Sequence, residues 1–216
     1  MRKIDKSTIL SKNYKEWLES LGDEHPKYNS SNNKYYVDIK MSLLYCQKGL
    51  CAYTEELLCD MELIEPKHWS NGRYTTELDN QNLINGDIEH FDCTLKEKQG
   101  YLWDNLFMVN SNINCRVKGT KTINPILKPD STEYDAFKYL EFDDKLNMFK
   151  PNKQLSDKDK KDVLDMIETL GLNSNAFKRA KQIKELKEDF EFDLDLKEPH
   201  EYITSWKMTL KNLKGE

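Results

Sequence analysis

The chain has 216 residues, of which 38 are acidic and 33 are Lys or Arg, so its formal net charge is −5. Charged residues make up 33% of the sequence, and no apolar run approaches the ~18 residues of a membrane-spanning helix, which argues against a membrane protein. The 5 cysteines include no C-x-x-C pair, which argues against a disulfide framework and a complete zinc knuckle. The opening residues lack the apolar core of a signal peptide, so we expect a cytoplasmic protein.

Basic residues are concentrated in one part of this acidic chain. Residues 94–128 contain 6 Lys or Arg but only 2 acidic residues, whereas the remainder is strongly acidic. A local basic segment can bind a polyanion at one place, while the overall negative charge argues against indiscriminate coating of nucleic acid.

Residues 1–50 are predicted to form an N-terminal helical segment. Apolar residues recur at helical spacing over residues 14–21 and again over residues 36–48, and a glycine follows each pattern. The polar stretch 28–33 between them is typical of a loop. We expect both helices to pack in the core.

Residues 51–128 are predicted to form short strands and one short helix. Brief apolar runs alternate there with turn-forming residues, a pattern that favours small strands. In chain order we expect a hairpin turn at Asn71-Gly72, a strand over residues 83–88 that runs into Glu89 and His90, a strand over residues 106–109, and a helix over residues 114–118 that Gly119 ends.

Residues 129–216 are predicted to form a C-terminal helical region. Ser156 and Asp159 form a near capping box, and the helix that they begin is expected to end at Gly171. A further helix is expected over residues 175–188. Strands between flanking helices indicate an α+β fold. The stripe predicted to face the core comprises Val163, Leu164, Ile167 and Leu170.

The adjacent residues Glu89 and His90 suggest phosphodiester hydrolysis. This reaction needs a base that deprotonates water and a divalent cation that neutralises charge in the transition state. Because neighbouring side chains of a strand point in opposite directions, Glu89 can face a metal while His90 faces the attacking water. Asn105 is expected to fix either the loop or the imidazole ring.

A third oxygen ligand is predicted at Asn114, with Asn110 and Asn112 as open alternatives. An amide oxygen at the start of a short helix can reach a hard cation such as Mg²⁺ or Mn²⁺. The basic residues expected to contact nucleic-acid phosphates are Arg116, Lys118 and Lys121.

Taken together, these motifs resemble the HNH (ββα-metal) nuclease superfamily, in particular the small PtuB-type HNH proteins of Septu and retron anti-phage systems. The resemblance covers roughly residues 36–190. Its motifs are Gln47-Lys-Gly-Leu-Cys-Ala-Tyr-Thr-Glu55, Ile88-Glu-His-Phe91, Trp103-Asp-Asn-Leu-Phe107, Asn114, Lys118-Gly119, Tyr139-Leu-Glu-Phe142, Leu170-Gly-Leu-Asn173 and Arg179.

The resemblance implies a small ββα-metal core flanked by N-terminal and C-terminal helices, and a DNA endonuclease of an anti-phage system. It implies that His90 is the general base, Asn105 the central asparagine of the motif, and Glu89 and the last asparagine the ligands of one Mg²⁺ or Mn²⁺. It also implies an ABC-type ATPase as partner subunit.

Two departures from the family pattern affect these expectations. The family often has two C-x-x-C pairs that bind zinc, but here Cys51-Ala-Tyr-Thr54 and Asn110-Ser-Asn-Ile113 lack three of the four cysteines, so we expect no structural zinc. One extra residue separates Asn114 from Lys118, which leaves the third ligand open. The alternative functions are a catalytically decayed HNH-fold interaction subunit and an enzyme that cuts a defined site alone.

Overall fold

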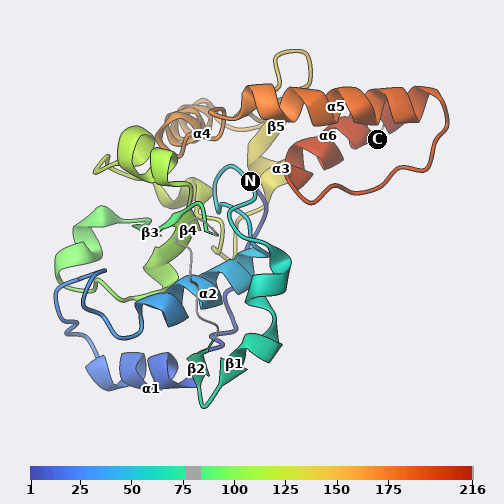
Figure 1. The fold of residues 1–216 in the computed structure, drawn as a ribbon. Helices are drawn as coiled ribbons and strands as arrows, with labels where there is room; N and C mark the ends of the chain where they lie inside the picture. The colour runs from blue at the N-terminus through green and yellow to red at the C-terminus, as the bar shows by residue number, and fades with distance from the viewer. Residues whose placement is uncertain (76–83, 216) are drawn as a thin grey trace.

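Two helices joined by a polar loop form the N-terminal part of the molecule (Figure 1). In the computed structural model, which describes residues 1–75 and 84–215, helix α1 (Lys12–Leu21) begins after Ser11, whose hydroxyl accepts a hydrogen bond from the Tyr14 amide. Helix α2 (Tyr36–Gln47) is followed by two residues with positive φ and is buried on most sides. Both predicted helices are therefore confirmed.

The Asn71-Gly72 turn joins two very short antiparallel strands, β1 (Trp69–Ser70) and β2 (Arg73–Tyr74). Asn71 has φ 50° and Gly72 has φ 75°. Asn-Gly is the dipeptide best suited to a hairpin turn that needs positive φ at both central positions. The predicted hairpin is therefore confirmed.

A strand, a strand and a short helix follow in the middle of the chain. Strand β3 (Asp87–His90) pairs antiparallel with β4 (Leu106–Val109), all of whose residues are buried. The helix η6 (Ile113–Lys118) is a π-helix and ends at Gly119, as predicted. Leu83, predicted in the first strand, lies outside the described residues.

Shorter helices connect these elements. Each is a single 3₁₀ turn or slightly longer, a common form for connecting segments. They are η1 (Met61–Ile64), η2 (Pro66–His68), η4 (Cys93–Glu97), η5 (Trp103–Asn105) and η7 (Pro125–Leu127).

The C-terminal region is mostly helical, as predicted, but it also contains a β-hairpin that was not predicted from the sequence. Strands β5 (Leu140–Asp143) and β6 (Met148–Pro151) pair antiparallel. Leu140 and Phe142 are buried while the residues between and after them are partly exposed, which is the alternation of a strand packed on one face. The helices of this region are α3 (Ala136–Tyr139), α4 (Asp157–Thr169), α5 (Ala176–Glu191) and α6 (Ile203–Lys214).

Helix α4 follows most of the prediction. The Ser156 hydroxyl accepts a hydrogen bond from the Asp159 amide at 3.1 Å, and Gly171, with φ 65°, follows the helix end. Val163, Ile167 and Leu170 are buried, but Leu164 is 46% exposed and does not belong to the core stripe.

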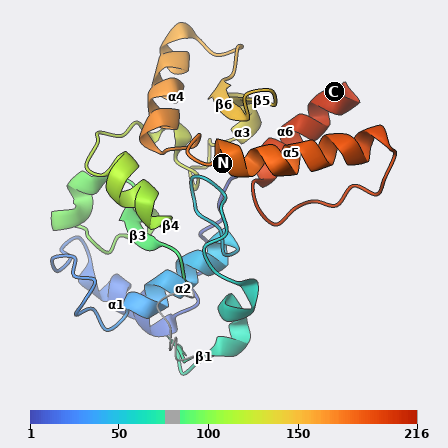
Figure 2. The ribbon, with the colours of Figure 1, turned by 45° about the horizontal axis from the view of Figure 1, so that its top comes forward.

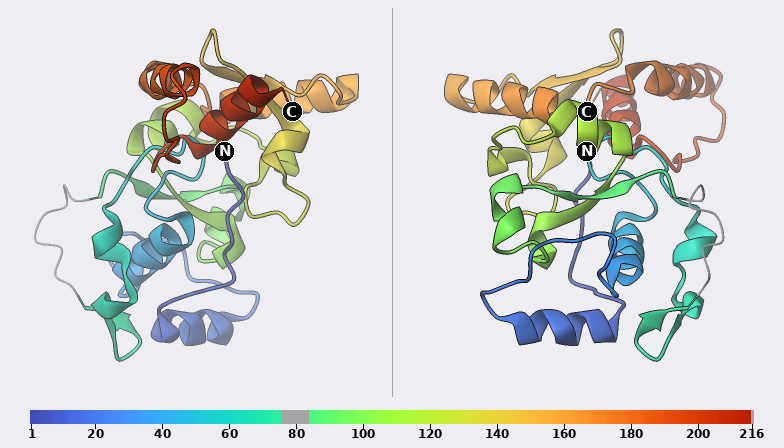
Figure 3. Two further views of the ribbon diagram at one scale, coloured as in Figure 1. Left: turned by 90° about the vertical axis from the view of Figure 1, so that its right-hand side faces the viewer. Right: turned by 60° about the vertical axis from the view of Figure 1, so that its left-hand side comes forward.

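The helices and the small sheets share one hydrophobic core. The buried cluster includes Ile39 from the N-terminal helices, Phe107 from β4 and Ile167 from α4. Figure 2 separates α4 from the neighbouring α5 and α6, with the β5–β6 hairpin near them. Figure 3 shows the opening segment running from the C-terminal helices past β3 and β4 toward α1. In the described part of the chain, no helix has the length and apolar character to cross a bilayer.

Candidate active site

The end of β3 places Glu89 and His90 on opposite sides of the β3–β4 pair. Glu89 lies opposite Phe107 and His90 opposite Leu106 in the register of the two strands. Both side chains are buried, with Glu89 3% and His90 5% exposed. The expected divergence of the two side chains is visible in their partners, which come from different parts of the fold.

The imidazole of His90 is held in one tautomer. Its Nε2 lies 2.9 Å from the carbonyl oxygen of Gly100. Because a carbonyl only accepts, Nε2 carries the hydrogen and Nδ1 keeps a free lone pair. The ring of Tyr28 packs edge-on against it at 4.5 Å between ring centroids.

The environment of His90 keeps the ring neutral at physiological pH. Burial lowers its pKa from 6.5 to about 4, and the charges of Lys96 and Lys118 act in the same direction, while the hydrogen bond to Gly100 opposes them. A neutral imidazole with an unprotonated nitrogen is the form that accepts a proton.

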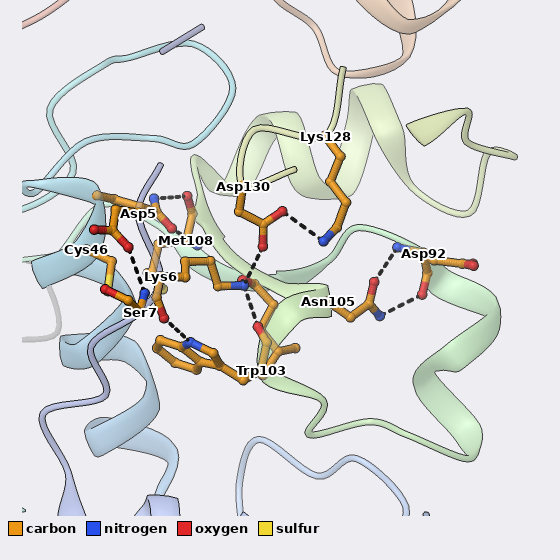
Figure 4. A network of polar contacts seen from close by, with 12 residues as sticks. Asp5, Lys6, Ser7, Cys46, Asp92, Trp103, Asn105, Met108, Lys128 and Asp130 are labelled. Carbon is orange, nitrogen blue, oxygen red and sulfur yellow. Dashed lines mark hydrogen bonds and ion pairs between the residues drawn. The ribbon is translucent and has the colours of Figure 1, made fainter. Parts of the chain in front are cut away.

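Asn105 fixes the backbone that follows His90 (Figure 4). Its Oδ1 accepts a hydrogen bond from the Asp92 amide at 2.8 Å, and its Nδ2 donates to the Asp92 carbonyl at 2.9 Å. The Asn105 carbonyl also accepts from the Phe91 amide at 2.8 Å. Asn105 was predicted to fix either the loop or the imidazole ring, and its hydrogen bonds in the structure are to the loop.

The carboxylate of Glu89 has a hydrogen-bond donor on each oxygen. Oε1 lies 2.5 Å from Nζ of Lys118, and Oε2 accepts from the Tyr53 hydroxyl at 2.5 Å. Lys118 Nζ also donates to the His90 carbonyl at 3.0 Å. Burial raises the pKa of Glu89 above its ordinary value, although Lys118 and Tyr53 partly offset this effect.

The structure separates the basic residues that were predicted together. Arg116 and Lys121 are exposed, as phosphate contacts require, but Lys118 is only 1% exposed. Its ammonium contacts Glu89 and the His90 carbonyl, at the end of β3. The prediction that Lys118 contacts phosphates therefore does not hold in this arrangement.

Asn114, the predicted third oxygen ligand, lies in the π-helix η6. Its side chain is half-buried, and among the described residues no hydrogen bond joins its amide to the Glu89 carboxylate. The Asn114 carbonyl accepts from the Gly119 amide at 2.9 Å, a bond across five residues that defines the π-turn. A π-turn contains one residue more than an α-turn. This difference matches the one residue by which the spacing from Asn114 to Lys118 exceeds that of the family.

Asn110 joins the two segments that the resemblance aligns with zinc-binding pairs. Its amide donates to Sγ of Cys51 at 3.5 Å, and its Nδ2 donates to Glu56 at 3.0 Å. Its Oδ1 also accepts from the amide of Asn112 at 3.0 Å. These bonds hold the asparagine-rich turn against the chain at Cys51.

The oxygen donors beside Lys118 suit a hard cation. Within residues 1–75 and 84–215, no three His, Cys, Asp or Glu side chains gather to hold a metal. However, the Glu89 carboxylate and the His90 carbonyl both contact a cation, the ammonium of Lys118. Carboxylate and carbonyl oxygens are also the ligands that Mg²⁺ uses. The donor set thus fits a divalent ion, provided that the ammonium withdraws.

Sequence reasoning missed three partners of this site. Tyr53 lies 36 residues before Glu89, which it binds. Gly100 binds His90 through its backbone carbonyl, and Tyr28 comes from a polar loop. Tyr53 lies within the Cys51–Thr54 stretch of the family motif, and this position was the signal in the sequence that could have identified it as part of the site.

No protein-family model matches the sequence, and a search of curated proteins returns no match. The interpretation of the site therefore depends on its own residues and their geometry.

Proposed function

We propose that this chain is a metal-dependent phosphodiester hydrolase of the HNH type, an endonuclease that cuts DNA. The observation that carries the proposal is the state of His90. Its Nε2–H donates to the Gly100 carbonyl, which leaves Nδ1 as a base. The carboxylate of the neighbouring Glu89 binds the ammonium of Lys118.

In this proposal, the residues of the chain have distinct roles. His90 accepts a proton from the attacking water at Nδ1, and Asn105 is a positioning residue that fixes the backbone after it. Glu89, the His90 carbonyl and Asn114 would supply oxygens to one Mg²⁺ or Mn²⁺. Such an ion would neutralise the charge that develops on the phosphate.

Substrate binding requires a change at the surface of the site. His90 is 5% exposed and Tyr28 covers it, so the segment that carries Tyr28 must move aside when DNA binds. Arg116 and Lys121 are exposed near the end of η6 and are the proposed phosphate contacts. Such contacts do not read base sequence.

The resemblance extends the proposal to the cellular context. A nuclease with few base contacts needs a partner that directs it, and the family implies an ABC-type ATPase in an anti-phage system. A cytoplasmic location belongs to the same proposal.

Nicking of supercoiled plasmid in the presence of Mg²⁺ or Mn²⁺ tests the proposal. Replacing His90→Ala is expected to reduce the rate by about 10²-fold or more, because a general base contributes this much. The matched control is His200→Ala, an exposed histidine before α6, which should leave the rate unchanged. Equal rates for the wild type and His90→Ala would contradict the proposal.

The second candidate is a catalytically decayed HNH-fold interaction subunit. The burial of His90 and the Lys118 ammonium on Glu89 favour it. It predicts no cleavage by either the wild type or His90→Ala, even when the ATPase partner is present.

A further inference from the structure

Lys118 has an unusual position for a lysine at the end of a short helix. Its side chain is fully buried, whereas Gly119 and Thr120, the next two residues, are exposed. Lysine is almost never fully buried unless it is paired, and here its ammonium lies 2.5 Å from Glu89 Oε1 and 3.0 Å from the His90 carbonyl. We infer that Lys118 is an internal competitor of the metal: its ammonium holds these two oxygens until a divalent cation displaces it.

The competition follows from the chemistry of the two oxygens, and it rests on the metal site of the proposed function. Both are hard oxygen donors, and the Tyr53 hydroxyl orients the carboxylate by binding its other oxygen. An ammonium and a divalent cation cannot share this position, because like charges at such a distance repel strongly in a buried environment. The ammonium must leave for the metal to bind.

The backbone that follows Lys118 turns at the protein surface. Lys118 is the last residue of η6, and Gly119 follows with φ 54°. A Cβ added at Gly119 would approach no atom closer than 4.0 Å, so this turn lies in open surroundings. In the proposed exchange, the ammonium moves outward past this turn.

Removal of the ammonium is expected to create a stronger metal site. A buried carboxylate without a counter-ion is unfavourable, so Glu89 in Lys118→Met would gain more from a bound cation than Glu89 in the wild type. Lys118→Met preserves most of the side-chain volume. The matched control is Lys121→Met, which removes the same charge from an exposed position nearby.

The test is titration of each purified full-length variant with Mn²⁺ in a calorimeter. We expect Lys118→Met to bind Mn²⁺ more tightly than the wild type by a factor on the order of ten or more, and Lys121→Met to bind like the wild type. Adding Glu89→Gln to Lys118→Met should abolish the gain. Equal or weaker binding by Lys118→Met, or no binding by any variant, would overturn the inference.

A second measurement uses the wild-type protein alone, in case Lys118→Met does not fold. Acetylation of lysines followed by peptide mass spectrometry should find Lys118 protected without metal and modified in saturating Mn²⁺, with Lys121 modified in both. Continued protection of Lys118 in Mn²⁺ would also overturn the inference. Both readouts are independent of DNA cleavage. If Lys118→Met binds Mn²⁺ more tightly but the protein does not cleave DNA, the competition stands and the nuclease proposal is rejected. If the protein cleaves DNA but Lys118→Met binds Mn²⁺ no more tightly, the nuclease proposal stands and the competition is rejected.

Discussion

At the scale of single residues, His90 and Glu89 are neighbours with different surroundings. Burial keeps the His90 ring neutral and one carbonyl binds its Nε2, whereas the Glu89 carboxylate is bound by an ammonium and a phenol. A carboxylate paired with an ammonium and an imidazole that stays unprotonated can be neighbours in sequence because the strand directs them to opposite sides.

The lowered pKa of His90 predicts a specific acid sensitivity. The unfolded chain takes up a proton near pH 6.5, whereas the folded protein takes it up near pH 4, so the unfolded state binds more protons between these values. The free energy of unfolding should therefore fall, by up to about 3 kcal/mol, as the pH decreases from about 6.5 to about 4. Urea unfolding of the wild type and His90→Gln at pH 7 and pH 4.5 checks this. A loss of the same size in both proteins would contradict it.

The roles of single residues were less predictable than their presence. The sequence identifies Glu89, His90 and Asn105 as a group, since they flank two apolar strands. The burial of Lys118 was not predictable, because its neighbours Arg116 and Gly119 are typical of an exposed helix end. Its position depends on how far the π-turn rotates the helix, which the sequence pattern does not reveal.

At the scale of elements, the loop after β3 depends on one amide. Asn105 immediately precedes β4 and binds both backbone groups of Asp92, which follows β3, so it joins the ends of the two strands. A side-chain amide suits this task because it offers a donor and an acceptor in one plane.

Replacing Asn105→Asp is expected to weaken this connection. The donor to the Asp92 carbonyl would become a carboxylate oxygen facing another oxygen, so the free energy of unfolding should fall by about 2 kcal/mol. Chemical denaturation at pH 7 measures it. The control Asn112→Asp, exposed at the start of η6, should change stability little. A comparable loss in the control would show that charge alone is responsible.

Helices that end at a glycine were predicted well, whereas a short apolar run that fits both a helix and a strand was not. Glycines end or follow α1, α2, α4 and η6 as expected. The β5–β6 hairpin was missed because Leu140 and Phe142 also fit a helical pattern when the run is short. The pairing is favoured by the turn, where Asn147 adopts φ 55°, and by the contact of Phe142 with Phe149.

At the scale of the whole molecule, the opening segment binds parts of the fold that lie far along the chain. Lys6 Nζ donates to the Leu106 carbonyl at 2.9 Å and pairs with Asp130 at 3.3 Å, and Trp103 donates to the Lys6 carbonyl at 2.9 Å (Figure 4). Burial lowers the pKa of Lys6 to about 8. Residues near the start of the chain thus support the beginning of β4.

Replacing Lys6→Met should destabilise the molecule substantially. The change removes a buried charge that binds two carbonyls and a carboxylate, so we expect the free energy of unfolding to fall by about 3 kcal/mol. Lys3→Met on the same segment is the control; its exposed side chain binds only the Thr132 carbonyl among the described residues, and it should cost less than about 1 kcal/mol. Urea denaturation separates the two outcomes, and equal losses would contradict the role of Lys6.

The placement of this opening segment also constrains how the protein is made. Its hydrogen bonds join residues up to 133 positions apart, as between Tyr134 and Met1. During synthesis these first residues leave the ribosome long before their partners exist, and contacts of such long range form late. The segment therefore stays undocked until these partners are synthesised. The β3–β4 pair reaches its final packing only after more than half of the chain has been translated.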